Sequence, residues 1–505
     1  MTAGVRPERR NVLAPPSRRP GINGVAYDTA WLAGLPRHDD RRSSRFPTTL
    51  RWLADNQLSD GSWGSSVRYE HDRILCTLAA VAPLAEFGRR AEDRAAVDKG
   101  TRYLWQHGHL IGREPVELVG FELLLPTLVE RARTAGVAVP PHLDVYATQR
   151  THKLALLPKE MLYSPRATVV HSLEFLGDQA DPAALKTAQG SNGAVGNSPA
   201  ATAFMLQATR EENASALSYL ETVLGHAGGA TAPVLHPCET FELLWAAYHL
   251  YLGGAPGHTL LRPTERRQLL SALQTRGGVS LSPTFPIPDA DDTAVALLLL
   301  HDLGESVEPS VLKAFEAKDG SFVSFPYERH SSVGVNVHVL HALARVPGYP
   351  DADTAIERIC DYLADQHSGL YWIDKWHISP LYATAHVLCA VEDVAPHHRR
   401  RLAHLVERSR EWLRHSQNAD GSWGFYGQST PEETAYGLLA LAVSADDRDM
   451  RHCQAAANYL HQAAADGVSH PPLWIDKCLY IPPLVVTAAI DAALRAWTSR
   501  TEKRS

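Results

Sequence analysis

One turn sequence recurs near opposite ends of the chain and constrains its fold more than any other feature. QLSDGSWG spans 57–64 and QNADGSWG spans 417–424, with weaker echoes in KDGSF at 318–322 and QHSGLYW at 366–372. Recurrence of one turn between helices is typical of repeat architectures. Asp-Gly supplies a sharp turn, and Trp63 or Trp423 can pack over the helix end that carries Gln57 or Gln417. The repeat therefore predicts two related helical barrels stapled by structural turns.

The segments between these turns carry apolar residues at helical spacing. AVALLLLHDLG, ETAYGLLALAV and TAIERICDYLADQ are examples, and almost nothing alternates with period two over the length of a strand. A chain of 505 residues is too long for one ordinary core, which suggests two domains of about 200 residues each. We therefore expect an all-α protein made of two α/α-barrel domains.

Composition narrows the class of protein. Apolar residues make up 45% and charged residues 21% of the chain, as in globular proteins, and the net charge of -7 gives no reason to expect a nucleic-acid partner. The six cysteines are scattered without a CxxC pair, which favours a reduced, cytoplasmic compartment. No apolar run reaches the roughly 18 residues of a membrane span, so no transmembrane segment is expected. The Arg- and Pro-rich residues 1–20 lack the apolar core of a signal peptide and predict a disordered tail.

The stretch FPIPDADDTAVALLLL carries the strongest chemical signal. It places Asp289, Asp291 and Asp292 directly before an apolar helix. Helix capping explains one or two of them, but three within four residues repel one another unless one stays protonated. A neutral carboxyl can protonate an alkene if its conjugate base is well stabilised. We interpret Asp291 as that acid, held by Asp289 and Asp292, although the pattern alone leaves capping and a metal site open.

DADDTA resembles the DxDDTA sequence of class II terpene cyclases. Further segments resemble copalyl diphosphate synthase-type diterpene cyclases: AYDTAW at 26–31, VGFELLLPTLVERA at 119–132, PKEMLYSPRATVVHSLE at 158–174, FELLWAAYHL at 241–250 and FEAKDGSF at 315–322. The resemblance covers nearly the whole chain after about residue 20. It implies a γ domain inserted into a β domain, with the active site between them. Residues 21–45 would begin the β domain, 46–245 would form γ, and 246–505 would complete the β domain that carries the acid.

The resemblance also implies residues that bind the substrate. Lys153 and Lys375, the latter in WIDKWHISP, align with basic residues that the family uses near the diphosphate. An ammonium pair suits a dense anionic headgroup. His171 matches a histidine that helps plant ent-copalyl enzymes position a water molecule. The asparagine partner of that histidine aligns with Val234, so the pair is broken and ent-copalyl stereochemistry is not carried over; His236 is a nearby alternative acceptor.

Aromatic side chains are expected around the reacting chain, because they stabilise passing positive charge through cation–π contacts. Trp372 and Phe322 are candidates, although aromatic residues at helix-packing positions are commonly part of the core.

The family also binds magnesium through an acidic segment upstream of the GFE that stands here at Gly120, Phe121 and Glu122. Glu114 and Glu117 are the nearest candidates, but a clean EDxxD is absent, and the alternative is acidic residues at a helix start. Mg²⁺ itself is expected because it commonly bridges diphosphate oxygens and carboxylates. The sequence contains neither DDxxD nor NDxxSxxxE, by which class I synthases ionise a diphosphate, so the product should keep its diphosphate.

These features together predict an isomerase-type enzyme. Its expected reaction is protonation-initiated cyclisation of geranylgeranyl diphosphate to a bicyclic labdane- or halimane-type diphosphate. The alternative substrate is farnesyl diphosphate, which would give a drimenyl-type product. More distant alternatives are a squalene-type triterpene cyclase, an α/α-barrel glycosidase, whose two carboxyl groups would stand apart across a cleft, and a non-enzymatic helical scaffold.

Overall fold

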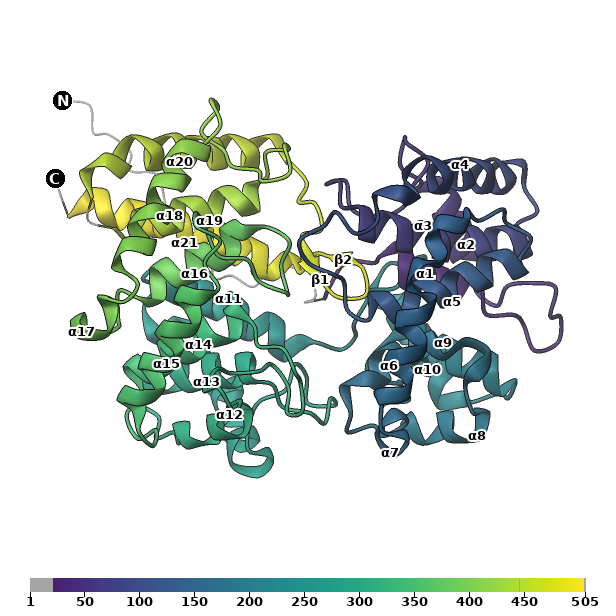
Figure 1. Ribbon diagram of the computed structural model, residues 1–505, viewed down its shortest axis with the longest axis horizontal. Coiled ribbons are helices and arrows are strands. Elements are labelled where there is room, and N and C mark those ends of the chain that lie inside the picture. The colour runs from purple at the N-terminus through teal and green to yellow at the C-terminus, as the bar shows by residue number, and fades with distance from the viewer. Residues whose placement is uncertain (1–20, 445, 504–505) are drawn as a thin grey trace, which may run out of the picture.

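The protein folds into two helical lobes joined by a long loop (Figure 1). The computed structural model describes residues 21–444 and 446–503, so the tail expected over residues 1–20 lies outside the described residues. Almost all described secondary structure is helical, and the paired strands form one two-stranded sheet. The expected all-α class is therefore confirmed.

The first lobe is a ring of helices closed on itself, which we call the first barrel. Each helix of the ring packs on the next, in the order α1, α3, α5, η3, α9 and back to α1. The ring consists of α1 (Ala26–Ala33), α3 (Glu70–Phe87), α5 (Phe121–Thr134), the 3-10 segment η3 (Thr168–Gln179) and α9 (Pro199–Thr209). The helices outside it are α2 (Pro47–Asp55), α4 (Ala91–His107), α6 (Ala147–Leu156), α7 (Lys159–Leu162), α8 (Pro182–Leu185) and α10 (Ala214–His226).

The second lobe repeats this plan with longer helices and forms the second barrel. Its ring runs α11, α13, α14, α16, α19, α21 and back to α11. The ring consists of α11 (Glu239–Leu252), α13 (Ala290–Asp302), α14 (Val333–Arg345), α16 (Pro380–Ala390), α19 (Pro431–Ala442) and α21 (Pro483–Glu502). The helices outside it are α12 (Pro263–Arg276), α15 (Ala352–Asp365), α17 (Pro396–Arg399), α18 (Ala403–Ser416) and α20 (Met450–Asp466).

Two of the expected domain boundaries differ from this packing. Helix α1 lies in the segment 21–45 that we assigned to the domain of the acid, yet it packs on α2, α3 and α9 and closes the first barrel. Helix α11 crosses the expected boundary at residue 245 and packs on α13 and α21 of the second barrel. The change from one barrel to the other therefore falls before Glu239.

The recurring turns staple neighbouring helices as the sequence predicts. Trp63 donates its indole N–H to the carbonyl of Leu53 near the end of α2 at 2.8 Å, and Trp423 donates to Leu413 near the end of α18 at 3.0 Å. The glycine of each Asp-Gly turn has a positive φ, +93° at Gly61 and +87° at Gly421. Since a side chain is strained in that conformation, glycine is required at both turns.

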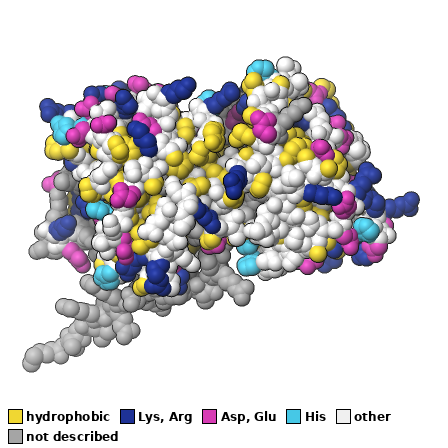
Figure 2. All heavy atoms as spheres, turned by 90° about the horizontal axis from the view of Figure 1, so that it is seen from below, with side chains coloured by type: hydrophobic (Ala, Val, Ile, Leu, Met, Phe, Trp, Pro, Cys, Tyr) yellow, Lys and Arg dark blue, Asp and Glu magenta, His cyan; other side chains and the backbone are white. Residues whose placement is uncertain are grey.

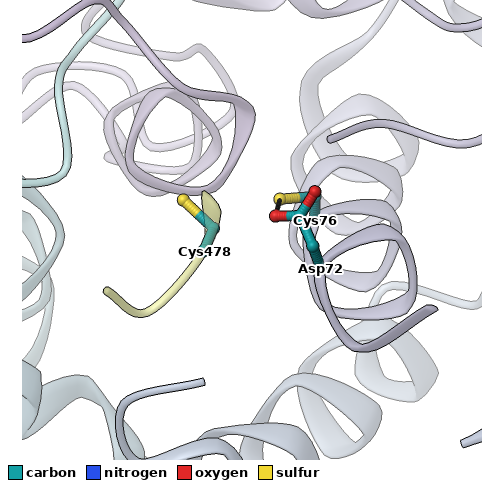
Figure 3. Close-up of side chains that lie close together, drawn as sticks. All are labelled: Asp72, Cys76 and Cys478. Carbon is teal, nitrogen blue, oxygen red and sulfur yellow. Dashed lines mark hydrogen bonds between the residues drawn. The ribbon is translucent and has the colours of Figure 1, made fainter. Parts of the chain in front are cut away.

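A β-hairpin reaches from the second barrel into the first, and we call residues 471–481 the latch. Strand β1 (Trp474–Ile475) pairs antiparallel with β2 (Leu479–Tyr480). The backbone N–H of Leu479 donates to Asp72 of α3 at 2.8 Å. At the turn, Cys478 lies beside Asp72 and Cys76 of α3 (Figure 3). The latch thus binds the two barrels together.

A buried lysine at the tip of the latch completes this attachment. The Lys477 ammonium lies 3.0 Å from a Glu174 carboxylate oxygen, 2.6 Å from the Ser198 hydroxyl and 3.7 Å from Asp28. Glu174, Ser198 and Asp28 belong to the first barrel. The Lys477 side chain that reaches them is fully buried. Since an unpaired buried charge is strongly destabilising, Lys477 and its carboxylates stabilise the structure only as a group.

The outer surface shows mixed charge. Positive and negative side chains are interspersed over the face drawn in Figure 2, as expected from the modest net charge of -7. Across the described residues, no helix is both long enough and apolar enough to cross a membrane.

Candidate active site

The acidic sequence forms the first turn of α13, between the two barrels. Asp289 is the N-cap, and its carboxylate accepts a hydrogen bond from the Asp292 backbone N–H at 2.7 Å. The Ala290 N–H donates to the Ser324 carbonyl at 2.9 Å, which holds this turn against the loop before α14. Capping, which the pattern left open, therefore accounts for Asp289 and leaves the other two carboxyls unexplained.

Asp291 is 9% exposed and contacts a histidine rather than another carboxyl. Its Oδ1 lies 2.7 Å from Nδ1 of His338 on α14. Burial raises the pKa of Asp291 well above its ordinary value, and the charge of Asp374 raises it further. Burial lowers the pKa of His338 to about 4. Burial therefore favours the protonated form of the Asp291 carboxyl.

Asp292 is the third aspartate of the motif. Burial raises its pKa well above the ordinary value, and the adjacent Asp289 adds to the shift. Burial also raises the pKa of Asp289 to about 7. Two adjacent buried carboxyls cannot both ionise at low cost, which is why Asp289 raises the pKa of Asp292. The repulsion predicted from the sequence thus acts between Asp289 and Asp292.

A cavity opens in front of these carboxyls, at the junction of the barrels. Its volume is about 170 Å³, and Asp289, Asp291 and Asp292 line it from the second barrel. The first barrel contributes Val119, Thr168 and His171, and the latch contributes Trp474, Ile475, Asp476 and Tyr480. The three aspartates therefore face a cavity that both barrels line.

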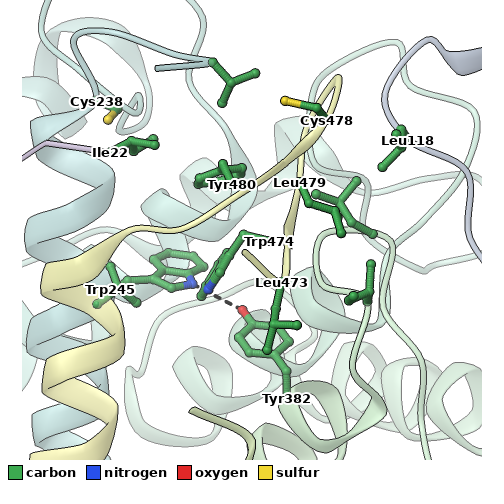
Figure 4. Packing of buried hydrophobic residues seen from close by; sticks show 14 of the residues in the cluster. Ile22, Leu118, Cys238, Trp245, Tyr382, Leu473, Trp474, Cys478, Leu479 and Tyr480 are labelled. Carbon is green, nitrogen blue, oxygen red and sulfur yellow. Dashed lines mark hydrogen bonds between the residues drawn. The ribbon is translucent and has the colours of Figure 1, made fainter. Parts of the chain in front are cut away.

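The walls of this cavity are mostly aromatic on the side of the second barrel. The aromatic residues that line it are Phe241, Trp245, Phe285, Phe325, Trp376, Tyr382, Trp474 and Tyr480. Trp474 of the latch lies against Tyr382, with 5.1 Å between ring centres, and Trp245 donates its indole N–H to the Tyr382 hydroxyl at 3.2 Å (Figure 4). Rings fixed by such contacts can stabilise a cation without rearranging.

Comparison with known proteins decides the family. Residues 328–471 match the squalene-hopene cyclase C-terminal domain. The chain is 32% identical to the type B diterpene cyclase of Mycobacterium tuberculosis, over 96% of this chain and 98% of the relative. It is 33% identical to the labda-7,13-dienyl diphosphate synthase of Streptomyces clavuligerus, over 94% and 89%. The solved ent-copalyl diphosphate synthase of Streptomyces platensis superposes with a TM-score of 0.79 at 29% identity, over 95% of this chain and 96% of that one.

The chain belongs to the class II diterpene cyclases. It is therefore an isomerase-type enzyme, and the glycosidase and scaffold alternatives are set aside. Enzymes of this class are generally acid catalysts, which agrees with the raised pKa of Asp291.

His171 lines the cavity of the cyclase and has a partner that the sequence did not suggest. Its Nε2 lies 3.0 Å from Oδ1 of Asp476 in the latch, and its Nδ1 lies 2.9 Å from the Gly196 carbonyl. Burial alone would lower the pKa of His171, but the Asp476 carboxylate raises it, and the net shift is upward. The two side chains form a hydrogen bond at the wall shared by the first barrel and the latch.

The expected headgroup lysines do not line the cavity of the cyclase. Lys153 lies on α6 of the first barrel, where it is half exposed and forms an ion pair with Glu122. Lys375 lies in the second barrel and forms an ion pair with Glu328, while its ammonium also donates to the His330 carbonyl at 3.0 Å. The structure therefore does not bring the two ammonium groups together at this cavity.

The two aromatic candidates also lie away from the cavity. Trp372 is fully buried and donates its indole N–H to the Leu363 carbonyl at the end of α15, at 2.6 Å. Phe322 is fully buried and packs on Tyr349. Both belong to weaker copies of the recurring turn, so they occupy positions equivalent to the stapling tryptophans. This common position explains why they pack between helices rather than against a substrate.

Glu114 and Glu117 do not form a metal site by themselves. Glu114 accepts the Glu70 backbone N–H at 2.7 Å, and Glu117 accepts the Tyr146 hydroxyl at 3.2 Å. Among the described residues, neither belongs to a cluster of three or more potential metal ligands. Protein carboxylates alone therefore do not provide the ligands that Mg²⁺ requires here.

Proposed function

We propose that this cyclase converts geranylgeranyl diphosphate to a bicyclic labdane- or halimane-type diphosphate by protonating its terminal alkene with Asp291. The observation that carries this proposal is a buried carboxyl, with a pKa raised by burial, that faces an aromatic cavity between the two barrels. The names of the relatives, a diterpene cyclase and a labdadienyl diphosphate synthase, support the C20 substrate and the retained diphosphate.

The proton moves from Asp291 to the terminal alkene of the substrate. The carboxyl O–H bond breaks and a C–H bond forms, leaving a tertiary cation that the next alkenes attack in turn. A base then takes a proton from the cyclised cation, and the electron pair of that C–H bond forms the product alkene and ends the reaction. The Asp291 carboxylate left behind keeps its contact with His338, and this hydrogen bond strengthens as the charge develops.

The cavity walls guide the cation. Trp245, Trp376 and Trp474 present their rings to the same space, and cation–π contacts of about 0.5–2 kcal/mol each favour charge near them. Ligand pockets usually hold about 300–1,000 Å³, so the walls must move apart to admit a prenyl chain into the cavity of about 170 Å³. Closure around the bound chain then excludes water that would quench the cation.

The diphosphate is proposed to lie toward the first barrel. The half-exposed Lys153 is the basic residue of this barrel that the family resemblance points to, and it would have to leave Glu122 to bind the headgroup. Mg²⁺ would enter with the diphosphate and use its oxygens as ligands, because Glu114 and Glu117 already have protein partners. No step of the proton transfer depends on the metal.

The proposal is tested by incubating the purified enzyme separately with geranylgeranyl and farnesyl diphosphates, with and without Mg²⁺. Products are analysed by mass spectrometry before and after phosphatase treatment. We expect a cyclic C20 isomer that still carries its diphosphate, and at least a thousandfold lower turnover by Asp291→Asn, because the amide keeps the shape but lacks the acid proton. Asp393→Asn, at a partly exposed carboxyl, is the matched control. Cyclisation of farnesyl diphosphate alone would change the substrate, and an active Asp291→Asn enzyme would contradict the mechanism.

A further inference from the structure

A further buried carboxyl lies behind the aromatic wall of the cavity. Glu432 belongs to the first turn of α19 and is fully buried. Its Oε1 accepts the Trp474 indole N–H at 2.8 Å and the Tyr436 hydroxyl at 3.1 Å, and it lies 3.3 Å from Nε2 of His377. Trp474 lines the cavity, whereas Glu432 does not. Glu432 therefore contacts the wall of the cavity from behind, through Trp474.

The three groups that donate to Glu432 are all neutral. An indole N–H and a phenol O–H carry no charge. His377 accepts the Ser379 backbone N–H on Nδ1 at 3.0 Å, so this nitrogen holds no proton, and the single N–H of the neutral imidazole lies on Nε2. His377 therefore donates to Glu432 as a neutral ring. Three donors on one oxygen favour the ionised carboxylate, but they do not neutralise its charge.

No cation of the protein balances this carboxylate. Among the residues that the structure describes, no lysine or arginine forms an ion pair with Glu432, and its buried Oε2 has no hydrogen-bond partner. The nearby His249 and His470 supply no charge either, because burial lowers the pKa of both, that of His249 to about 3. A buried charge without a countercharge is costly, and features that cost stability tend to belong to functional sites.

The adjacent Glu433 shows what a structural carboxyl does at the same helix start. It accepts the Ser379 hydroxyl at 2.6 Å, the Thr430 hydroxyl at 2.8 Å and the Phe425 backbone N–H at 2.9 Å. It thereby joins the N-cap of α19 to the start of α16, and it does not line the cavity. Capping thus accounts for Glu433 and leaves Glu432 unexplained.

We propose that Glu432 is a positioning residue, an ionised carboxylate that orients the ring of Trp474 and supplies the countercharge for the cation formed in the cavity. This inference rests on the proposed function, because a countercharge is needed only if the reaction passes through a cation. An anion on the indole N–H polarises the ring and strengthens its cation–π contact. The carboxylate also attracts the cation directly, because the protein interior screens charge less than water does.

The position of Glu432 behind the ring keeps it out of the bond-making steps. A carboxylate exposed in the cavity could take a proton from the cation too early or form an ester with it. Because Trp474 lines the cavity and Glu432 does not, the charge acts on the cation while the carboxylate oxygens stay apart from the substrate. No bond of Glu432 forms or breaks, so the proton balance remains that of the proposed function.

Removal of the charge tests this role. Glu432→Gln keeps the shape of the side chain, and we expect kcat to fall about tenfold to a hundredfold while KM changes less than about threefold, since the cation forms only after the substrate has bound. Glu433→Gln is the matched control, because it removes an equally buried carboxylate from the same turn and should keep kcat within about threefold. Both full-length variants are assayed with geranylgeranyl diphosphate after circular dichroism has shown that they fold.

A charged inhibitor separates this role from a structural one. The probes are an aza analogue of geranylgeranyl diphosphate, whose protonated amine replaces the first cation, and the dihydro analogue that has carbon in place of nitrogen. By isothermal titration calorimetry, Glu432→Gln should weaken binding of the aza analogue at least about fivefold and leave that of the dihydro analogue unchanged. Equal weakening of both probes, or of neither, overturns the inference, as does a loss of kcat no larger than that in Glu433→Gln.

A second variant decides if Glu432→Gln does not fold. Trp474→Phe keeps a ring but loses the N–H that contacts the carboxylate, so it should weaken the aza analogue at least about threefold relative to the dihydro analogue. An unchanged ratio of the two affinities contradicts the inference. If the wild-type enzyme cyclises no diphosphate, the proposed function fails, whereas the difference between the two probes is still measured.

Discussion

Both barrels bury carboxyl groups at their junction, but the partners differ. In the first barrel, Glu174 lies 3.0 Å from the Lys477 ammonium. Burial alone would lower the pKa of Lys477, but the charges of Asp28 and Glu174 raise it. Lys477 therefore stays charged. In the second barrel, Asp291 contacts the neutral His338, and burial raises the pKa of the carboxyl instead. Glu174 thus takes part in a buried ion pair, whereas Asp291 has a neutral imidazole as its direct partner and a pKa raised by burial.

Removing the cation from the first barrel should have the largest effect on stability. Lys477→Met leaves Glu174 and Asp28 buried without their partner, so the free energy of unfolding should fall by about 3–5 kcal/mol. Thermal and urea unfolding measure this change. Lys313→Met is the matched control, because the Lys313–Glu316 pair is largely exposed on its lysine side and should contribute under about 1 kcal/mol. Equal losses in the two variants would contradict the assigned role of Lys477.

Placing a charged residue beside Asp291 should replace its contact with a neutral imidazole by a salt bridge. In His338→Lys, an ammonium beside Asp291 would lower the pKa of the carboxyl and keep it ionised. We expect kcat to fall by about a hundredfold to a thousandfold, equivalent to roughly 3–4 kcal/mol in the barrier, while circular dichroism remains that of the folded enzyme. Near wild-type turnover by a folded variant would show that Asp291 does not need a neutral neighbour.

The raised pKa of Asp289 predicts how stability depends on pH. The folded pKa of about 7 exceeds the ordinary value of 3.8, so between these values the folded state binds more protons than the unfolded state. Stability conferred by this group is therefore lost as pH rises, by about 2 kcal/mol between pH 5 and pH 7. Asp289→Asn keeps a good N-cap but does not titrate, so its unfolding free energy should fall less over this interval. An unchanged pH slope in the variant would contradict the raised pKa.

The smallest expected effect concerns the two walls of the cavity. Trp376→Leu removes a ring from the aromatic wall of the second barrel, and kcat should fall about threefold to thirtyfold through the lost cation–π contact. Val119→Ala, on the wall of the first barrel, removes no aromatic group and should change kcat by less than about threefold. Steady-state rates and product ratios measure both effects. A larger effect at Val119 would show that shape rather than ring electrons limits the reaction.

Features that depend on neighbouring residues in the chain could be predicted from the sequence. The aspartates lie at the start of α13, and Trp63 reaches Leu53 ten positions away, as their local sequences indicate. His338 could not be predicted because 47 positions separate it from Asp291, and no pattern marks this histidine among the 25 in the chain. Only the ring of helices brings the two side chains together.

The tetrapeptide WIDK illustrates the same limit. It occurs at 372–375 and again at 474–477. The family resemblance pointed to Lys375 of the first copy, which forms an ion pair with Glu328 in the second barrel. The second copy forms the latch, where Asp476 pairs with His171 at the cavity wall and Lys477 is buried in the first barrel. Identical local sequences therefore differ in role because one of them crosses the junction between the barrels.

The latch also has a consequence for how the protein is made. Lys477 lies 303 positions after Glu174, so all of these residues must be translated before the first barrel receives its cation. Until then, two carboxyl groups in its interior lack the group that neutralises them. The first barrel is therefore completed by a residue that is translated only after most of the second barrel.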